Sequence, residues 1–231
     1  NASGEMPSLL GSAGATAVWA EENTRGAIFD AMKAKETYGT SGTLIRLRFF
    51  GGWDYDNDLI EDKNFVKKAY KEGVPMGQDL PKKDGKAPTF AVWALKDPES
   101  GNLDRIQVIK GFINKWGRTD EKVYNVAWSD KRKLDPKTGK LPSVGNTVDA
   151  KTAKYTNDIG DTQLSAVWTD PDFDPQQKAV YYVRVLEIPT PRWTTYDSVK
   201  SGLPIPEGIP LSIQERAWSS PIWYTPEMAS K

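Results

Sequence analysis

The chain has 231 residues, with 31 basic and 31 acidic side chains, a formal net charge of +0, no histidine and no cysteine. These absences exclude a Ser-His-Asp triad, a cysteine nucleophile, a disulfide and a Cys/His zinc site. The balanced charge disfavours binding to nucleic acid. No apolar run approaches the roughly 20 residues of a membrane span. We therefore expect neither nucleic acid nor a membrane as a partner.

The chain opens on Asn1 rather than on Met, and Asn1-Ala2 is interpreted as the remnant of a removed tag. Residues 1–10 contain neither a basic segment nor an apolar run, so no signal peptide is predicted there. We therefore expect the chain to have been excised from a longer protein. Its oligomeric state does not follow from the sequence.

One helix is predicted near the start of the chain. Ala27, Ile28, Ala31 and Met32 form an apolar stripe at helical spacing, and Asn23 is the expected N-cap. Gly39 and Gly42 are expected to end this region and to begin a turn-rich crossing segment.

The rest of the chain is predicted to form antiparallel strands separated by turns. The expected strands are 44–50, 90–95, 105–113, 121–129, 164–168, 180–188 and one near 218–224. The third and fourth are expected to form a hairpin, and 180–188 is apolar on both faces, which indicates a central position in a sheet. Four Asp-Pro pairs, at 97, 135, 170 and 174, mark turns. We predict a mainly β fold, an antiparallel β-sandwich of about eight strands.

A long proline-rich segment interrupts this pattern. Residues 189–213 hold five prolines, and we expect an irregular, stiff loop there. Arg192 beside Trp193 joins a planar cation to an aromatic ring, which suits an anionic group. Arg192 is the residue expected to touch substrate or a domain interface, with an internal carboxylate partner as the favoured alternative.

Two acidic turns invite a calcium interpretation. Asp54, Asp56 and Asp58 alternate, but an EF-hand loop would need Gly and Glu where Leu59 and Phe65 stand, so a solvated acidic loop is favoured. The second turn contains Asp170, Asp172 and Asp174. They are candidate calcium ligands, but capping of turns beside proline is the favoured role.

Other candidates lie in the last strands. Arg184 is expected to be buried with a carboxylate partner, for which Glu215, Glu187 or an Asp of the turns would serve. Trp193, Trp218, Trp223 and Tyr224 either fill the core or stack on sugars. The candidates for contact with substrate or a domain interface are thus Arg192, Trp193, Arg184, Glu215 and Arg216. No pair of carboxylates has the spacing of a glycosidase acid and base, so no catalytic residue is assigned.

Several long motifs in this chain resemble one bacterial family, the domain of unknown function 3604. The likeness covers nearly the whole chain and is carried by VWAEENTRGAIFDAM (18–32), RFFGGWD (48–54), SGNLDRIQVIKG (100–111), EKVYNVAWSD (121–130), VWTDPDFDP (167–175), YYVRVLEIPTPRWTTYD (181–197) and ERAWSSPIWYTP (215–226). The family looks like a branch of the PHP superfamily of metal-dependent hydrolases, many of them phosphoesterases, built on a distorted barrel. The stretch resembled is its C-terminal part.

The resemblance implies two regions. Residues 1–42 would be the last helix and crossing segment of a truncated PHP-type barrel, and residues 43–231 a C-terminal β-sandwich domain. The family's His-rich metal motifs are not in this sequence, so no metal ligand carries over, and a divalent metal is expected only in the missing catalytic domain. We expect no cofactor here, the chain's own N-terminal PHP-like domain as its partner, and a periplasmic or secreted parent protein.

Two functional hypotheses remain open. In the first, the chain is a non-catalytic domain that supports the barrel of a metal-dependent hydrolase of unknown substrate and walls its active site. In the second, it is a carbohydrate-type ligand-binding β-sandwich module. Burial of Trp193, Trp218 and Trp223 would argue against the module, whereas an exposed coplanar row of these rings would favour it.

Overall fold

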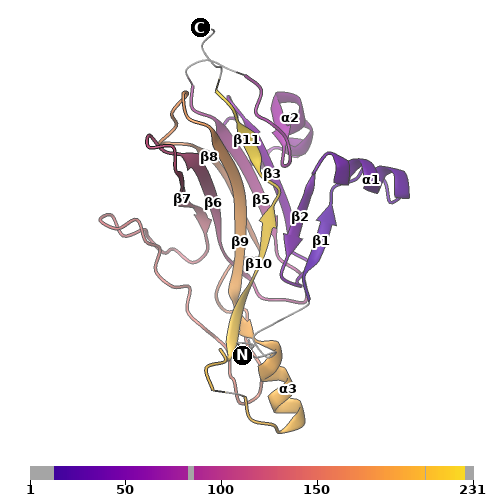
Figure 1. The fold of residues 1–231 in the computed structure, drawn as a ribbon. Helices are drawn as coiled ribbons and strands as arrows, with labels where there is room; N and C mark the ends of the chain where they lie inside the picture. Colours follow the sequence, from indigo (N-terminus) through magenta and orange to yellow (C-terminus); the bar gives the residue numbers. More distant parts are fainter. Residues whose placement is uncertain (1–12, 83–85, 206, 227–231) are drawn as a thin grey trace, which may run out of the picture.

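The chain folds into two antiparallel β-sheets that face each other, as predicted (Figure 1). A computed structural model describes residues 13–82, 86–205 and 207–226. Within these ranges there are eleven strands and three α-helices, more than the eight strands and one helix expected. The proposed tag remnant Asn1-Ala2 and the segment 1–10 lie outside the described residues.

The larger sheet has seven strands in the order β1-β2-β10-β9-β6-β7, with β11 also paired to β9. Its strands are β1 (Ala15–Val18), β2 (Thr37–Thr40), β6 (Leu103–Ile113), β7 (Thr119–Trp128), β9 (Ala179–Pro191), β10 (Ser212–Ser219) and β11 (Ile222–Tyr224). The predicted hairpin of β6 and β7 is confirmed. So is the central position of β9, which pairs with β6, β10 and β11.

The smaller sheet has four strands in the order β4-β3-β5-β8. They are β3 (Arg46–Gly52), β4 (Gly73–Pro75), β5 (Thr89–Leu95) and β8 (Gln163–Thr169). In β3 the predicted alternation holds, because Leu47 and Phe49 are buried while Arg46 is exposed. Successive side chains of a strand point to opposite faces, and the apolar face of this sheet is turned to the larger sheet.

The core fills the space between the two sheets. Phe90 of β5 meets Tyr181 of β9 with ring centroids 4.5 Å apart, and both side chains are buried. Each large apolar side chain removed from water contributes about 1.5–3 kcal/mol, so this interface is the main source of stability. A second cluster, which includes Phe50, Tyr55 and Ala69, packs α2 against the outside of the four-stranded sheet.

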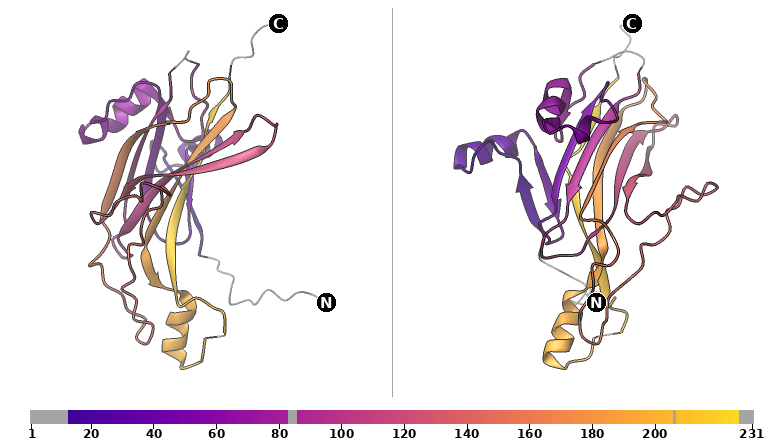
Figure 2. Two further views of the ribbon diagram at one scale, coloured as in Figure 1. Left: turned by 90° about the vertical axis from the view of Figure 1, so that its left-hand side faces the viewer. Right: turned by 180° about the vertical axis from the view of Figure 1, so that it is seen from behind.

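The three helices are α1 (Arg25–Lys33), α2 (Phe65–Glu72) and α3 (Trp193–Ser201). The predicted helix corresponds to α1, but its N-cap is Thr24, whose Oγ1 accepts from the backbone N–H of Ala27, and not Asn23. Of the two glycines expected to begin a turn-rich segment after it, Gly39 lies in strand β2, and Gly42 lies in the bend that follows, with a φ of 141°. Figure 2 shows α1 standing away from the sandwich at the end of the β1–β2 hairpin. None of the described helices is long and apolar enough to span a membrane.

The predicted proline loop is wrong in its main feature. Strand β9 runs on through Pro189 to Pro191, α3 follows, and β10 begins at Ser212. A proline lacks only the N–H donor, so its carbonyl and extended backbone still allow it to stand at the end of a strand. Pro206 lies outside the described residues. The irregular part is the short stretch that follows Gly202, whose φ of 74° ends α3.

The four Asp-Pro turns are confirmed. In each, an Oδ1 atom of the aspartate accepts the backbone N–H two residues further on, in Asp97, Asp135, Asp170 and Asp174. This is the local bond that makes aspartate a turn residue.

Candidate functional site

The outer face of the seven-stranded sheet, which points away from the core, gathers several of the predicted site residues. Strand β9 has Tyr181, Val183 and Val185 in the core, so Arg184 points outward between them. The strand register places Trp218 of β10 and Gln107 of β6 on either side of Arg184. We call the outward residues Trp218, Arg184, Gln107, Asn125 and Arg216 the outer-face site.

Hydrogen bonds link three planar groups of this site across three strands. Nε and Nη2 of Arg184 donate to Oε1 of Gln107 at 2.9 and 2.7 Å, and Nε2 of Gln107 donates to Oδ1 of Asn125 at 2.9 Å. The partner of Arg184 is therefore an amide, and the predicted carboxylate partner is wrong. The reason is that Arg184 is half-buried on the outer face, where it does not need a counter-charge as a fully buried guanidinium would.

Arg216 and Trp218 complete the outer-face site from β10. The guanidinium carbon of Arg216 lies 5.9 Å from the centroid of the Trp218 ring, which is 36% exposed. No carboxylate of the described residues lies within 4.0 Å of Arg184 or Arg216, so both positive charges are uncompensated by an ion pair. The site thus combines a partly exposed indole with two guanidinium groups, one of which lies over its ring.

Glu215 is not part of this site. The register between β10 and β9 shifts between Gln214 and Arg216, so Glu215 has no paired residue on β9. Its carboxylate accepts a hydrogen bond from the hydroxyl of Ser41.

A buried carboxylate lies near Glu215. Glu187 of β9 is 0% exposed, and its Oε2 accepts from Oγ of Ser100 at 2.5 Å. Burial raises the pKa of Glu187 to about 7, the hydrogen bond from Ser100 opposes the rise, and the charges of Glu215 and Asp97 add to it. Its Oε1 atom makes no hydrogen bond to the described residues.

Arg192 and Trp193 stand at the start of α3, a helix that Figure 1 shows at one end of the sandwich. Arg192 is the N-cap residue of α3 and only 7% exposed, with its Nη1 donating to Oγ1 of Thr194 at 3.1 Å. Trp193 is exposed, and the guanidinium carbon of Arg192 lies 5.3 Å from the centroid of its ring. Contact of Arg192 with substrate or a domain interface stays a prediction, but it would require a buried side chain to be uncovered.

The tryptophans expected to form a row are spread over the molecule. Trp193 is on α3, whereas Trp218 and Trp223 share the outer face of the large sheet. Trp218 pairs with Arg184, and Trp223 pairs with Val180. These two β9 residues are four positions apart, so the two tryptophans are separated by about 13 Å along the strand. Trp223 is half-buried, with the ammonium of Lys35 5.2 Å from its ring.

The second acidic turn holds a lysine rather than an open cation site. Nζ of Lys110 lies 2.6 Å from Oδ2 of Asp170 and 2.7 Å from the carbonyl oxygen of Asp172. The side chain of Asp172 accepts from Lys122 and Tyr124, and these bonds hold its pKa below the usual range. Asp174 caps its own turn. The favoured turn-capping role is found for Asp170 and Asp174, whereas the side chain of Asp172 bonds to Lys122 and Tyr124 instead.

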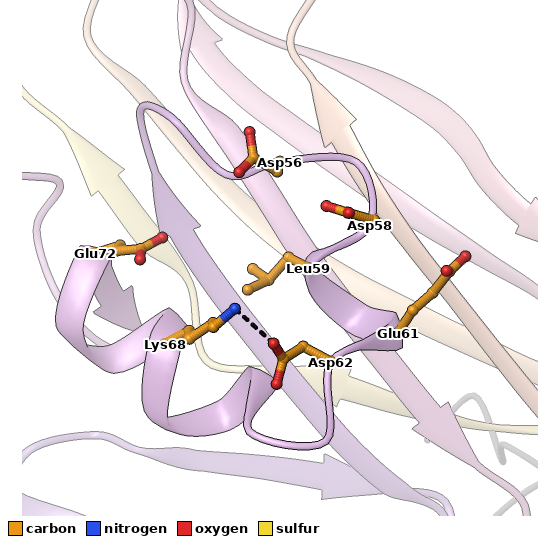
Figure 3. A pocket seen from close by; sticks show the side chains of 7 residues that line it. All are labelled: Asp56, Asp58, Leu59, Glu61, Asp62, Lys68 and Glu72. Atoms are coloured by element: carbon orange, nitrogen blue, oxygen red, sulfur yellow. Dashed lines mark ion pairs between the residues drawn. The ribbon is translucent and has the colours of Figure 1, made fainter.

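The first acidic loop forms the wall of a surface pocket (Figure 3). Its lining consists of Asp56, Asp58, Leu59, Glu61, Asp62, Lys68 and Glu72. Lys68 of α2 reaches Asp62 with a nitrogen–oxygen distance of 2.5 Å, and this hydrogen bond lowers the pKa of Asp62. In the described ranges no three acidic residues are arranged to hold a metal ion. The solvated loop that we favoured describes this region.

Gln107, Asn125 and Lys110 were missed from the sequence. Gln107 and Lys110 are polar residues inside the largely apolar strand β6, which is the signal that would have singled them out. Asn125 carries the same signal, because it stands inside the largely apolar run from Val123 to Trp128 of strand β7.

The two facing sheets define the chain as an antiparallel β-sandwich with a polar and aromatic outer face. The chain belongs to a family described as a protein of unknown function, DUF3604, whose model matches residues 3–226. It matches no curated protein and no solved structure.

Proposed function

We propose that this chain is a non-catalytic C-terminal β-sandwich of a PHP-type, phosphoesterase-like metal-dependent hydrolase, and that it packs against the catalytic domain of the same protein. The family resemblance supplies the class of that domain. The structural observation that supports docking is the exposed apolar side of α1.

This side of α1 has no partner in the described part of the chain. Phe29 is 62% exposed and Met32 56% exposed, and with Ile28 they line a shallow groove. Only Ala31 of the helix is buried. Isolated helices of nine residues are marginal in water, and most helical stability comes from packing of an apolar face. A domain that covers Phe29 and Met32 would supply this packing.

The β1–β2 hairpin would connect a catalytic domain bound at α1 to the sandwich. Strand β2 pairs with β10, and β10 pairs with the central strand β9. Strands β1 and β2 are therefore joined to the large sheet, while helix α1 between them extends outward. In this arrangement the chain supports the catalytic domain and walls its active site, and the divalent metal is bound by residues of that domain.

The first test is chemical. The full-length protein should contain a divalent metal and hydrolyse members of a panel of phosphate and sulfate esters. The 231-residue chain should retain no stoichiometric zinc, manganese or iron after dialysis, because it lacks His and Cys, the ligands these metals favour. A full-length protein without metal and without esterase activity would contradict the proposal.

The second test addresses docking. Phe29→Glu in the full-length protein should loosen the two domains, which limited proteolysis between them would detect as faster cleavage. Trp116→Glu is the matched control, since Trp116 is 72% exposed in the turn between β6 and β7, away from α1. Equal cleavage rates in the two variants would argue against docking through α1.

A further inference from the structure

We propose that the outer-face site binds an acidic saccharide, a sugar that bears a carboxylate or a sulfate group. The inference rests on Trp218, Arg184, Gln107, Asn125 and Arg216. It does not depend on the proposed role of α1, which lies elsewhere on the molecule.

The exposed indole supplies the surface for a sugar ring. On the β2 side, the residue paired with Trp218 is Gly39, which has no side chain and therefore leaves the indole uncovered on that side. Its ring is 36% exposed although it lies on a strand inside the sheet, between β2 and β9. A partly exposed tryptophan offers a rigid apolar surface, and the C–H side of a pyranose ring fits such a surface.

The two arginines determine the charge of the ligand. Arg184 is directly opposite Trp218, and Arg216 is a diagonal neighbour of Arg184, about 7–8 Å away. Neither makes an ion pair with the described residues, so the positive charges beside the indole lack a counter-charge. Guanidinium groups bind carboxylate and sulfate oxygens through two parallel hydrogen bonds.

The polar groups of the site are held in place before any ligand arrives. Gln107 is buried and uses its amide oxygen for Arg184 and its amide nitrogen for Asn125. This fixes the plane of the Arg184 guanidinium, so less side-chain entropy is lost on binding. Within the described residues, Nη1 of Arg184 and Nδ2 of Asn125 donate to no protein group, which leaves two donors for sugar oxygens.

The charge count favours a sugar over a nucleic acid. A nucleic-acid surface needs many clustered Lys and Arg residues, because each bound phosphate is neutralised separately. Here two arginines flank one indole, in a chain with as many acidic as basic residues. A ligand with sparse negative charge and many hydroxyl groups matches that composition.

The experiment uses the 231-residue chain and three polymers: polygalacturonate for the carboxylate, dextran sulfate for the sulfate and dextran as the neutral control. Affinity gel electrophoresis and calorimetry should show binding to at least one acidic polymer, at least tenfold tighter than to dextran. The two acidic polymers distinguish the two ligand chemistries. Binding to neither, or equal binding to dextran, would overturn the proposal.

Variants locate the site. Trp218→Ala should weaken binding at least tenfold, and Arg184→Gln or Arg216→Gln should reduce the preference for the acidic polymer over dextran. Trp116→Ala is the matched control, because Lys115 Nζ lies 4.6 Å from the Trp116 ring and reproduces the cation beside an exposed tryptophan. Trp218→Phe, which keeps an aromatic face, separates loss of binding from loss of fold. Unchanged binding in Trp218→Ala, or an equal loss in Trp116→Ala, would also overturn it.

Discussion

Lys110 and Asp170 join the two sheets of the sandwich through a buried ion pair, with Nζ 2.6 Å from Oδ2. Lys110 is on β6 of the large sheet, and Asp170 follows β8 of the small sheet directly. The hydroxyl of Tyr181 donates to the same carboxylate oxygen at 2.8 Å. The charges are thus paired and hydrogen-bonded, as burial requires.

Replacing the lysine should be costly. Lys110→Met leaves the carboxylate of Asp170 buried without its cation, and we expect a loss of about 3–5 kcal/mol in the free energy of unfolding. Urea unfolding at pH 7 measures it. The double variant Lys110→Met with Asp170→Asn should recover part of the loss, and Lys122→Met, in an exposed pair, should change stability much less. A small effect of Lys110→Met would show that the pair is unimportant for stability.

The buried Glu187 should make stability depend on pH. Its pKa is about 7 in the folded chain against 4.5 as its ordinary value, so the folded state favours the protonated carboxyl. Stability from this group is complete below about pH 4.5 and falls as the pH rises to about 7, by about 3 kcal/mol at most. Urea unfolding between pH 5 and 8 should show the decline.

Glu187→Gln should remove the loss of stability with rising pH that is due to Glu187, because an amide does not titrate. The same substitution at the exposed Glu99 is the matched control and should keep the slope of the unmodified chain. A Glu187→Gln protein with an unchanged slope would assign the pH dependence to other groups.

Amide exchange should be faster in α1 than in β9. The helix is short, has one buried residue and presents Phe29 and Met32 to solvent, whereas β9 is hydrogen-bonded on both sides. Hydrogen–deuterium exchange of Arg25–Lys33 and Ala179–Pro191, followed by mass spectrometry, compares the two. Equal protection would mean that α1 is an integral part of the sandwich.

Arg192→Ala should reduce stability by about 2 kcal/mol, because the buried guanidinium is bonded at the start of α3 and its removal leaves polar partners unsatisfied. Thermal unfolding measures this, with Trp193→Ala as the control at an exposed neighbour. In the full-length protein, slower turnover of Arg192→Ala with an unchanged melting temperature would instead indicate contact with substrate.

The sequence predicted what depends on local chemistry. Alternation in Leu47 and Phe49 and the apolar run of β9 correspond to burial in the structure, and every Asp-Pro turn follows from a bond between neighbours. Helix α3 was missed because β-branched and polar residues after two prolines are poor helix signals. Gly202, at its C-terminal end, was the available clue.

The outer-face site could not be assembled from sequence because its bonds join distant positions. Gln107 and Arg184 are 77 residues apart and meet only through the register of β6 and β9. Arg184 was identified as unusual, but its partner depends on which strand lies beside it. The order of strands in a sheet is a property of the whole chain.

The pairing of Thr40 with Ala217 has a consequence for synthesis of the chain. Strand β2 gains its neighbour β10 only after about 180 further residues have been translated, which takes roughly 10–35 s at elongation rates of about 5–20 residues per second. Throughout this interval strand β2 of the β1–β2 hairpin is an unpaired edge. Strand β9 likewise has an unpaired edge until β10 has been translated. A ribosome that stalls before Ser212 would therefore release a chain with two open edges, a substrate for chaperones and for aggregation.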